Sequence, residues 1–169
     1  MTDLEIRPTG SFRLLSPADK ESYLDHLYRL EPEAQRLRFA GAVSQAYIAD
    51  YACRALLPPS VVVGYFVDGT LRGTGELQPA APGNCEMAEA AFAVERPYRG
   101  KGIGTELMRC IIVEAQRRGI STIFTTCQVE NLRMRQLAEK YNAKLRIEHN
   151  EVAAYVPARD AALTAATRV

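Results

Sequence analysis

Residues 90–104 read AAFAVERPYRGKGIG, and this stretch joins the end of a strand pattern to a loop that contains three glycines. A long helical pattern, TELMRCIIVEAQRRG, follows at 105–119. Glycine lets backbone N–H groups approach a ligand closely, and the first turn of a helix offers such groups at the positive end of its dipole. Arg99 and Lys101 add positive charge beside them. The loop therefore predicts an anion site, which suits a pyrophosphate better than a neutral ligand.

Two better-known phosphate-binding patterns do not fit this loop. The dinucleotide-binding pattern G-x-G-x-x-G would need glycine at Thr105 or at Leu107, and no G-K-[ST] follows at the spacing of a P-loop. A strand-to-helix turn that needs glycine only for its flexibility remains an alternative on these residues alone.

Secondary-structure patterns extend in both directions from the loop. Ser16, Ser44 and Asn131 are typical helix N-caps, Gly119 is typical of a left-handed helix end, and Asp68-Gly69 suits a tight hairpin turn. The predicted helices span 16–30, 31–39, 44–57, 102–118 and 131–142, and the predicted strands span 61–67, 70–78, 85–94, 120–127, 143–149 and 151–156. This order predicts an α/β fold with a mixed, mostly antiparallel central sheet that is flanked by helices.

The length of 169 residues is that of one domain, which we expect over 1–169 with its core at about 11–157. The segment 158–169 shows no strong pattern and is expected to be a loose tail. The net charge of +1 gives no reason to expect nucleic acid as a partner. No apolar run approaches ~18 residues, so we expect no membrane span.

Cysteine and histidine usage favours a cytoplasmic protein without a metal. The cysteines have apolar neighbours and form no C-x-x-C pair, as expected of buried free thiols in a reducing compartment. The histidines are too few and too far apart for a zinc site. These residues are Cys53, Cys85, Cys110, Cys127, His26 and His149.

The loop and its surroundings resemble the Gcn5-related N-acetyltransferases (GNAT superfamily). The stretch VERPYRGKGIGTELM is similar to their acyl-CoA-binding motif, [RQ]-x-x-G-x-[GA], which Arg99, Gly102 and Gly104 satisfy. The later stretch NLRMRQLAEKYNAKL is similar to the family's Asn-bearing turn and helix after the fifth strand. The resemblance covers about residues 61–156. It implies a sheet that is splayed in the middle, between the strand ending at Val94 and the strand ending near Cys127.

The same resemblance implies acetyl-CoA as co-substrate and assigns residues to its parts. The pantetheine arm would pair with backbone at Phe92, Ala93 and Val94, and Asn131 would hydrogen-bond this arm or nearby backbone besides capping its helix. The phosphates would bind at Arg99, Gly100, Lys101, Gly102, Ile103, Gly104 and Thr105.

A closer resemblance is to the bacterial protein-lysine acetyltransferases of this superfamily. Their strand pattern E-x-A-F-x-V is met at 89–94, and their RF segment is met by Arg38-Phe39. The resemblance implies that Glu89 is the general base. The residue pattern adds that Glu89 is a carboxylate in a small, apolar strand, on the same face as Ala91 and Ala93. The alternatives are a solvent-facing glutamate or one paired with an arginine such as Arg72.

Position 138 departs from the common family pattern. Many members carry a tyrosine there as general acid, whereas this chain has Ala138 and its nearest tyrosine is Tyr141, for which packing is the favoured role. A thiol with a pKa of ~8.5 leaves readily without an acid. We therefore predict an N-acetyltransferase that transfers acetyl directly to a primary amine, on a protein lysine or a small molecule. The alternative is a catalytically weak or inactive acyl-CoA-binding sensor or interaction module. The sequence does not indicate an oligomeric state.

Overall fold

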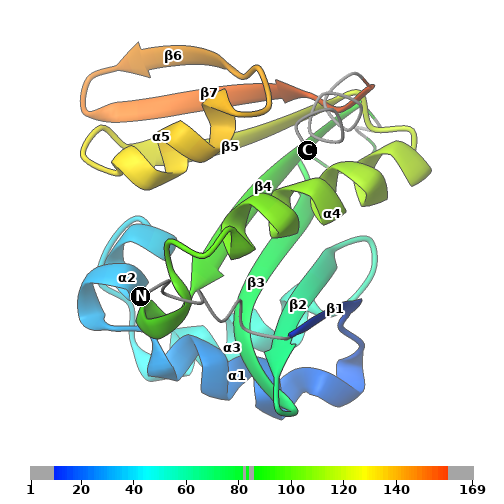
Figure 1. Ribbon diagram of the computed structural model, residues 1–169, viewed down its shortest axis with the longest axis vertical. Coiled ribbons are helices and arrows are strands. Elements are labelled where there is room, and N and C mark those ends of the chain that lie inside the picture. The colour runs from blue at the N-terminus through cyan, green and yellow to red at the C-terminus, as the bar shows by residue number, and fades with distance from the viewer. Residues whose placement is uncertain (1–9, 82, 84–85, 160–169) are drawn as a thin grey trace, which may run out of the picture.

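The computed structural model describes residues 10–81, 83 and 86–159, which form a seven-stranded sheet with helices on both faces (Figure 1). The strand order is β1-β2-β3-β4-β5-β7-β6. Every neighbouring pair is antiparallel except β4 and β5, which are parallel. The strands are β1 (Ser11–Leu14), β2 (Val61–Val67), β3 (Thr70–Pro79), β4 (Met87–Val94), β5 (Thr122–Gln128), β6 (Lys144–Glu148) and β7 (Glu151–Pro157). The predicted mixed, mostly antiparallel sheet is confirmed.

The helices divide the core between the two faces of the sheet. Helix α4 covers one face with Leu107 and Ile111, which belong to the same buried cluster as Leu77 of β3. Helices α1 and α3 cover the other face, where Tyr23 and Ile48 belong to a second cluster. The helical segments are η1 (Pro17–Asp19), α1 (Lys20–Arg29), α2 (Pro32–Arg38), α3 (Gln45–Ala55), η2 (Arg96–Tyr98), α4 (Ile103–Arg117) and α5 (Leu132–Glu139).

Most predicted caps and turns are confirmed. The Ser44 hydroxyl accepts a hydrogen bond from the Tyr47 amide at 3.1 Å, and Gly119 ends α4 with φ of 73°. The first predicted helix starts differently. A 3-10 turn that follows Ser16 precedes the α-helix, which begins only at Lys20.

Strand β1 is an element that the sequence patterns did not reveal. It pairs antiparallel with β2, from Ser11 opposite Phe66 to Leu14 opposite Val63. Phe12 is half-buried, whereas the other three residues of the strand are exposed. A short edge strand with one buried side chain carries too little alternation to stand out.

The expectations for the C-terminal tail and for the cysteines also differ in part from the structure. Ala158 is fully buried, and its amide donates to the Ser121 carbonyl at 2.9 Å, so the packed chain continues past 157. Cys127 is buried, but Cys53 and Cys110 are only half-buried free thiols. Cys85 and residues 160–169 lie outside the described residues. In the part of the chain that is described, no helix is long and apolar enough to cross a membrane.

The sheet opens in its middle, as the resemblance implied. The ladder between β4 and β5 consists of Met87 with Thr122, Ala88 with Ile123 and Glu89 with Phe124. Strand β4 continues to Val94 alongside β3, while β5 continues to Gln128 alongside β7. The two half-sheets therefore diverge beyond Glu89, and Figure 1 shows β5, β7 and β6 above the half that contains β1, β2 and β3.

Candidate active site

The opening between β4 and β5 leads into a cavity of about 300 Å³. Its walls come from segments that are far apart in the sequence: the end of α2, the first two turns of α3, the end of β3, the middle of β4, the second half of β5 with the start of α5, and the first residue of β7. Glu89 and Gln78 lie on the sheet side of this cavity, and Asn131 and Met134 lie on the α5 side.

The glycine-rich loop begins beyond the end of β4 and leads into α4. Gly100 and Gly102 have φ of 74° and 80°, the left-handed region that favours glycine, and Gly102 is the N-cap of α4. A Cβ at either position would meet no atom of the described residues within 4 Å. Both are exposed. The first amides of α4 are thus presented on an open surface, which fits an anionic group such as a pyrophosphate.

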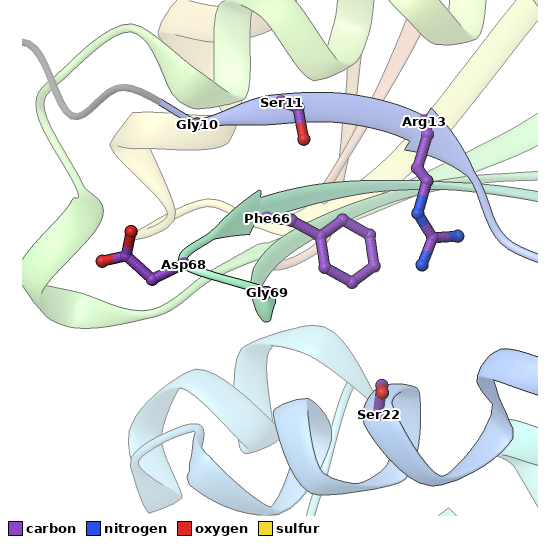
Figure 2. Close-up of a pocket in the computed structure, with 7 residues that line it drawn as sticks. All are labelled: Gly10, Ser11, Arg13, Ser22, Phe66, Asp68 and Gly69. Carbon is purple, nitrogen blue, oxygen red and sulfur yellow. The ribbon is translucent and has the colours of Figure 1, made fainter.

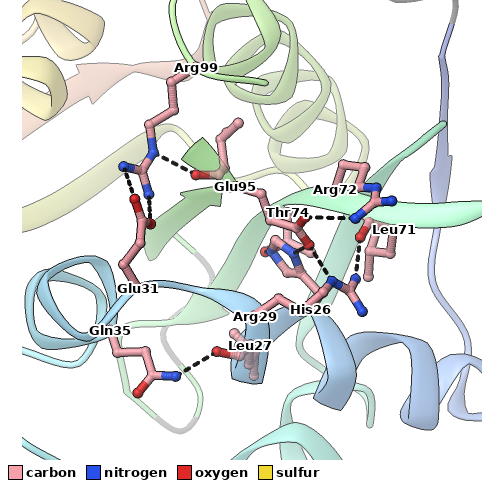
Figure 3. A network of polar contacts seen from close by, with 11 residues as sticks. His26, Leu27, Arg29, Glu31, Gln35, Leu71, Arg72, Thr74, Glu95 and Arg99 are labelled. Atoms are coloured by element: carbon pink, nitrogen blue, oxygen red, sulfur yellow. Dashed lines mark hydrogen bonds and ion pairs between the residues drawn. The ribbon is translucent and has the colours of Figure 1, made fainter. Parts of the chain in front are cut away.

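Arg99 does not present a free positive charge to this loop (Figure 3). Its guanidinium forms two hydrogen bonds to the Glu31 carboxylate, at 3.2 and 2.7 Å, and its Nε donates to the Val94 carbonyl at 2.7 Å. The side chain therefore ties the start of the loop to the N-cap of α2 and to the end of β4. This differs from the expectation that Arg99 adds positive charge to the anion site at the loop.

Two lysines lie near the first turn of α4 instead. The Lys101 ammonium is 5.8 Å from the ring centroid of Tyr98, and its side chain is exposed. Lys140, at the end of α5, donates from its Nζ to the Thr105 hydroxyl at 3.3 Å. Sequence reasoning missed Lys140, because only the packing of α5 against α4 brings it to this helix end.

The residues expected along the pantetheine arm lie at the opening of the sheet. Phe92 and Val94 pack against the α4 side of the core, whereas Ala93 is buried on the opposite face. Among the described residues, this stretch of β4 pairs with β3 only. Asn131 caps α5 by accepting from the Met134 amide at 3.2 Å, and it also lines the cavity. Its predicted cap role is confirmed.

Glu89 occupies the last rung of the β4–β5 ladder, where the cavity begins. It is opposite Gln78 on β3 and Phe124 on β5, and its side chain is exposed. The Thr126 hydroxyl is 3.4 Å from its Oε1 and donates to it. Arg72, which was one alternative partner for Glu89, pairs with Glu95 instead, at 3.0 Å.

A second carboxylate, Glu76, lies in the wall of the same cavity and is almost fully buried. Its Oε1 accepts hydrogen bonds from the Tyr23 hydroxyl and from Arg38. Its Oε2 accepts from the Tyr51 hydroxyl at 2.5 Å. Arg38 also donates to the Tyr51 oxygen at 2.6 Å. The donors come from α1, α2 and α3, so one β3 carboxylate holds three helices against the sheet.

Burial and charge set the protonation of this cluster. Burial alone would lower the pKa of Arg38, but the adjacent Glu76 carboxylate outweighs it and the pKa is raised well above its usual value. Burial and then the Glu76 charge raise the pKa of Tyr51. Both groups therefore keep their protons at any working pH. Sequence reasoning missed Glu76, although it is a carboxylate among strand residues, the same signal that drew attention to Glu89.

A second polar cluster lies at the end of β4 (Figure 3). The Glu95 carboxylate contacts His26 Nδ1 at 3.0 Å, Arg29 Nε at 2.9 Å and Arg72 Nη1 at 3.0 Å. These donors outweigh the effect of burial and hold the pKa of Glu95 at about 2. The cluster anchors α1 to the sheet.

Figure 2 shows another depression, bordered by β1, the β2–β3 hairpin and α1. Its cation, Arg13, lies over the Phe66 ring at 4.1 Å and is paired with Asp19 at 2.7 Å. The charge of Arg13 is therefore already balanced by Asp19.

A splayed sheet with a glycine-rich loop at the start of α4 and a cavity that opens between the two half-sheets is the arrangement expected of an acyltransferase of the GNAT type. Residues 20–143 match the model of the Acetyltransferase (GNAT) family, and the chain belongs to this family. It is 37% identical over 60 residues to Acetyltransferase Pat of Mycolicibacterium smegmatis, a match that spans 36% of this chain and 18% of that protein.

Solved structures share the fold. The GNAT domain of S. lividans PAT superposes with a TM-score of 0.77 at 19% identity, over 88% of this chain and 90% of that one. The structure of YncA from Salmonella typhimurium with its cofactor acetyl-CoA superposes with a TM-score of 0.65 at 15% identity, over 87% and 91% of the two chains. At these identities the likeness concerns the fold.

Proposed function

We propose that the protein transfers an acetyl group from acetyl-CoA directly to a primary amine, with a protein lysine as the favoured acceptor and Glu89 as the general base. The position of Glu89 carries this proposal, since it is the last residue of β4 that pairs with β5 before the sheet opens. A carboxylate at that point lines the same cavity as residues of α2 and α3.

The proposed reaction requires the protein to remove a proton from the acceptor amine. A lysine-like amine with a pKa of ~10.4 is almost entirely protonated at neutral pH, so a base must take a proton before the nitrogen can attack. Acetyl-CoA, when bound, supplies the acetyl thioester. Glu89 takes one proton from the ammonium group, and the nitrogen then forms the amide bond as the C–S bond breaks with its electron pair on sulfur. The second proton lost by the nitrogen ends on that sulfur, which leaves as the thiol. A thiolate leaves readily, so Ala138 in place of a tyrosine does not block the reaction.

Charge and sequence support a lysine acceptor. Two exposed carboxylates, Glu89 and Glu151, line the cavity, while the buried Glu76 is balanced by Arg38. The lining therefore carries net negative charge, which attracts an ammonium group. The resemblance to protein-lysine acetyltransferases at Glu89 and at Arg38-Phe39 points to the same acceptor class.

A thiol-release assay with a panel of acceptors tests the proposal. The panel contains a lysine peptide with a blocked N-terminus, the same peptide with arginine in place of lysine, and small alkylamines. We expect thiol release and one added acetyl group on the lysine peptide, and none on the arginine peptide. Binding of acetyl-CoA without thiol release on any acceptor would instead support the sensor or interaction module.

A further inference from the structure

The hydrogen bonds around Tyr51 determine which way the Gln78 side chain is turned. A tyrosine hydroxyl has one proton to donate and can accept two hydrogen bonds. Its proton goes to Glu76 Oε2 at 2.5 Å, because a carboxylate can only accept. The Arg38 guanidinium, at 2.6 Å from the hydroxyl oxygen, can only donate.

Gln78 is the third partner of this hydroxyl, and it must also donate. Its Nε2 lies 3.0 Å from the Tyr51 oxygen. Because the proton of Tyr51 is already committed to Glu76, the amide nitrogen rather than the amide oxygen has to face Tyr51. The carboxamide is planar and branched, so its oxygen is turned away from Tyr51.

The position of Gln78 places its side chain on the same face of the sheet as the proposed base. Gln78 lies directly opposite Glu89 in the β3–β4 ladder, and directly opposite residues share a face of the sheet. Both residues line the cavity. A fixed carbonyl oxygen and a carboxylate therefore lie on one wall, as two acceptors for the N–H groups of one amine.

We propose that Gln78 binds the acceptor amine through its side-chain carbonyl oxygen, next to Glu89, and that Tyr51 is a positioning residue that fixes the direction of the Gln78 amide. This inference rests on the proposed function. It assigns Tyr51, through its hydrogen bond to Gln78, a part in acceptor recognition beyond helping to hold three helices together. A primary ammonium group has enough N–H groups to satisfy Gln78 and Glu89 together, whereas a hydroxyl acceptor has only one proton to share between them.

The charges and protonation of the Glu76 cluster keep the orientation of the Gln78 amide constant. Arg38 and Glu76 balance each other's charge, so the cluster adds no free charge to the wall. The raised pKa of Tyr51, caused by burial and the Glu76 charge, keeps its proton on the hydroxyl. Gln78 Nε2 therefore has an acceptor at every pH at which the enzyme would work.

Three variants test the inference by steady-state kinetics with the lysine peptide. Gln78→Met keeps the length of the side chain and removes its carbonyl. Tyr51→Phe removes the oxygen that orients Gln78. Tyr23→Phe is the matched control, because Tyr23 also gives one phenolic hydrogen bond to Glu76, whereas Gln78 donates to Tyr51. We expect the first two variants to raise the KM for the peptide about 10-fold or more, as expected for a hydrogen bond to a charged group. The KM for acetyl-CoA should stay unchanged, and Tyr23→Phe should leave the peptide KM near wild type.

Calorimetry of the peptide, in the presence of CoA, separates this inference from the proposed function. If wild type binds but does not acetylate the peptide, and Gln78→Met weakens that binding, the proposed function fails and the inference holds. An unchanged peptide KM and dissociation constant in Gln78→Met would overturn the inference. A rise in peptide KM in Tyr23→Phe equal to that in Tyr51→Phe would overturn the orienting role of Tyr51. If no amine binds at all, both proposals fail. If Tyr51→Phe does not fold, the peptide KM and dissociation constant of Gln78→Met decide whether the inference holds.

Discussion

Glu89 differs from the other acidic side chains in the cavity wall because it is the last residue of β4 that pairs with β5, at the point where the sheet opens. Replacement by glutamine keeps its shape and removes its charge and basicity. We expect Glu89→Gln to lower turnover by ~10²–10⁴-fold, the usual cost of losing a general base. Activity of the variant should then climb with pH toward the pKa of the amine. The measurement is turnover against pH with the best acceptor of the panel.

Two controls accompany Glu89→Gln. Affinity for acetyl-CoA should barely change, since the proposed phosphate loop begins only beyond Val94. Glu148→Gln makes the same chemical change at an exposed position of β6 that does not line the cavity, and should have wild-type turnover. Equal rates for wild type and Glu89→Gln across the pH range would show that desolvation alone deprotonates the amine.

Tyr141 is a residue whose structural role accounts for its position. It is buried, and its hydroxyl donates to the Thr105 carbonyl at 2.7 Å in the first turn of α4. Burial raises its pKa to about 12. Tyr141→Phe should cost about 1 kcal/mol of stability through the lost hydrogen bond and keep most of the turnover. A loss of turnover of ~100-fold in a folded variant would instead make this hydroxyl a proton donor to the reaction.

At the scale of elements, the N-terminus of α4 is held in place by contacts from outside the loop. Arg99 links the loop to Glu31 at the start of α2, and Tyr141 links the first turn of α4 to the end of α5. Helix α2 ends at Arg38, in the cavity wall. The proposed phosphate site and the acceptor side of the cavity are therefore joined through α2.

Gly102→Glu tests the phosphate role of this helix end. A carboxylate at the N-cap would repel a pyrophosphate, and the left-handed conformation makes any side chain there strained. We expect no measurable binding of acetyl-CoA by calorimetry. Gly69→Glu is the matched control, because Gly69 has φ of 75° and an equally open position in the β2–β3 turn. If Gly102→Glu folds and binds acetyl-CoA like the control, the phosphate assignment is wrong.

At the scale of the whole molecule, local patterns predicted the elements well, but not the contacts between them. The Ser44 and Asn131 caps, the Asp68-Gly69 turn and the long α4 follow from neighbouring residues. The opening beside Glu89 was implied by resemblance and is confirmed by the short β4–β5 ladder.

The Glu76 cluster and the Arg99–Glu31 pair could not be predicted in this way. The cluster joins side chains from α1, α2, α3 and β3, and the ion pair joins residues 68 positions apart. No spacing rule connects such positions before the fold is known. Only Glu76 itself could have been noticed in the sequence, as a carboxylate within a strand pattern, because a buried carboxylate usually has a partner.

The Glu95 cluster makes the stability of the whole fold depend on pH. His26 is fully buried, and burial lowers its pKa below the ordinary 6.5. Below that pH the unfolded chain takes up a proton that the folded chain resists, so acidification destabilises the protein. The pKa of Glu95 is lowered from 4.5 to about 2, so its contribution is full above pH 4.5 and is lost as the pH falls toward 2. Both groups therefore act in the same direction, and the melting temperature should fall as the pH drops from roughly 7 to 3.

Glu95→Gln isolates the lower of these two pH windows. Without the carboxylate, Arg29 and Arg72 lose their ion-pair partner, so the variant should melt well below wild type at neutral pH. Its melting temperature should then depend less on pH below about 4.5, because no group at position 95 is left to protonate. Thermal melts of wild type, Glu95→Gln and the exposed control Glu148→Gln, followed by circular dichroism, make the comparison. Parallel curves for wild type and Glu95→Gln would mean that the acid sensitivity arises elsewhere and that the three donors do not hold Glu95 ionised.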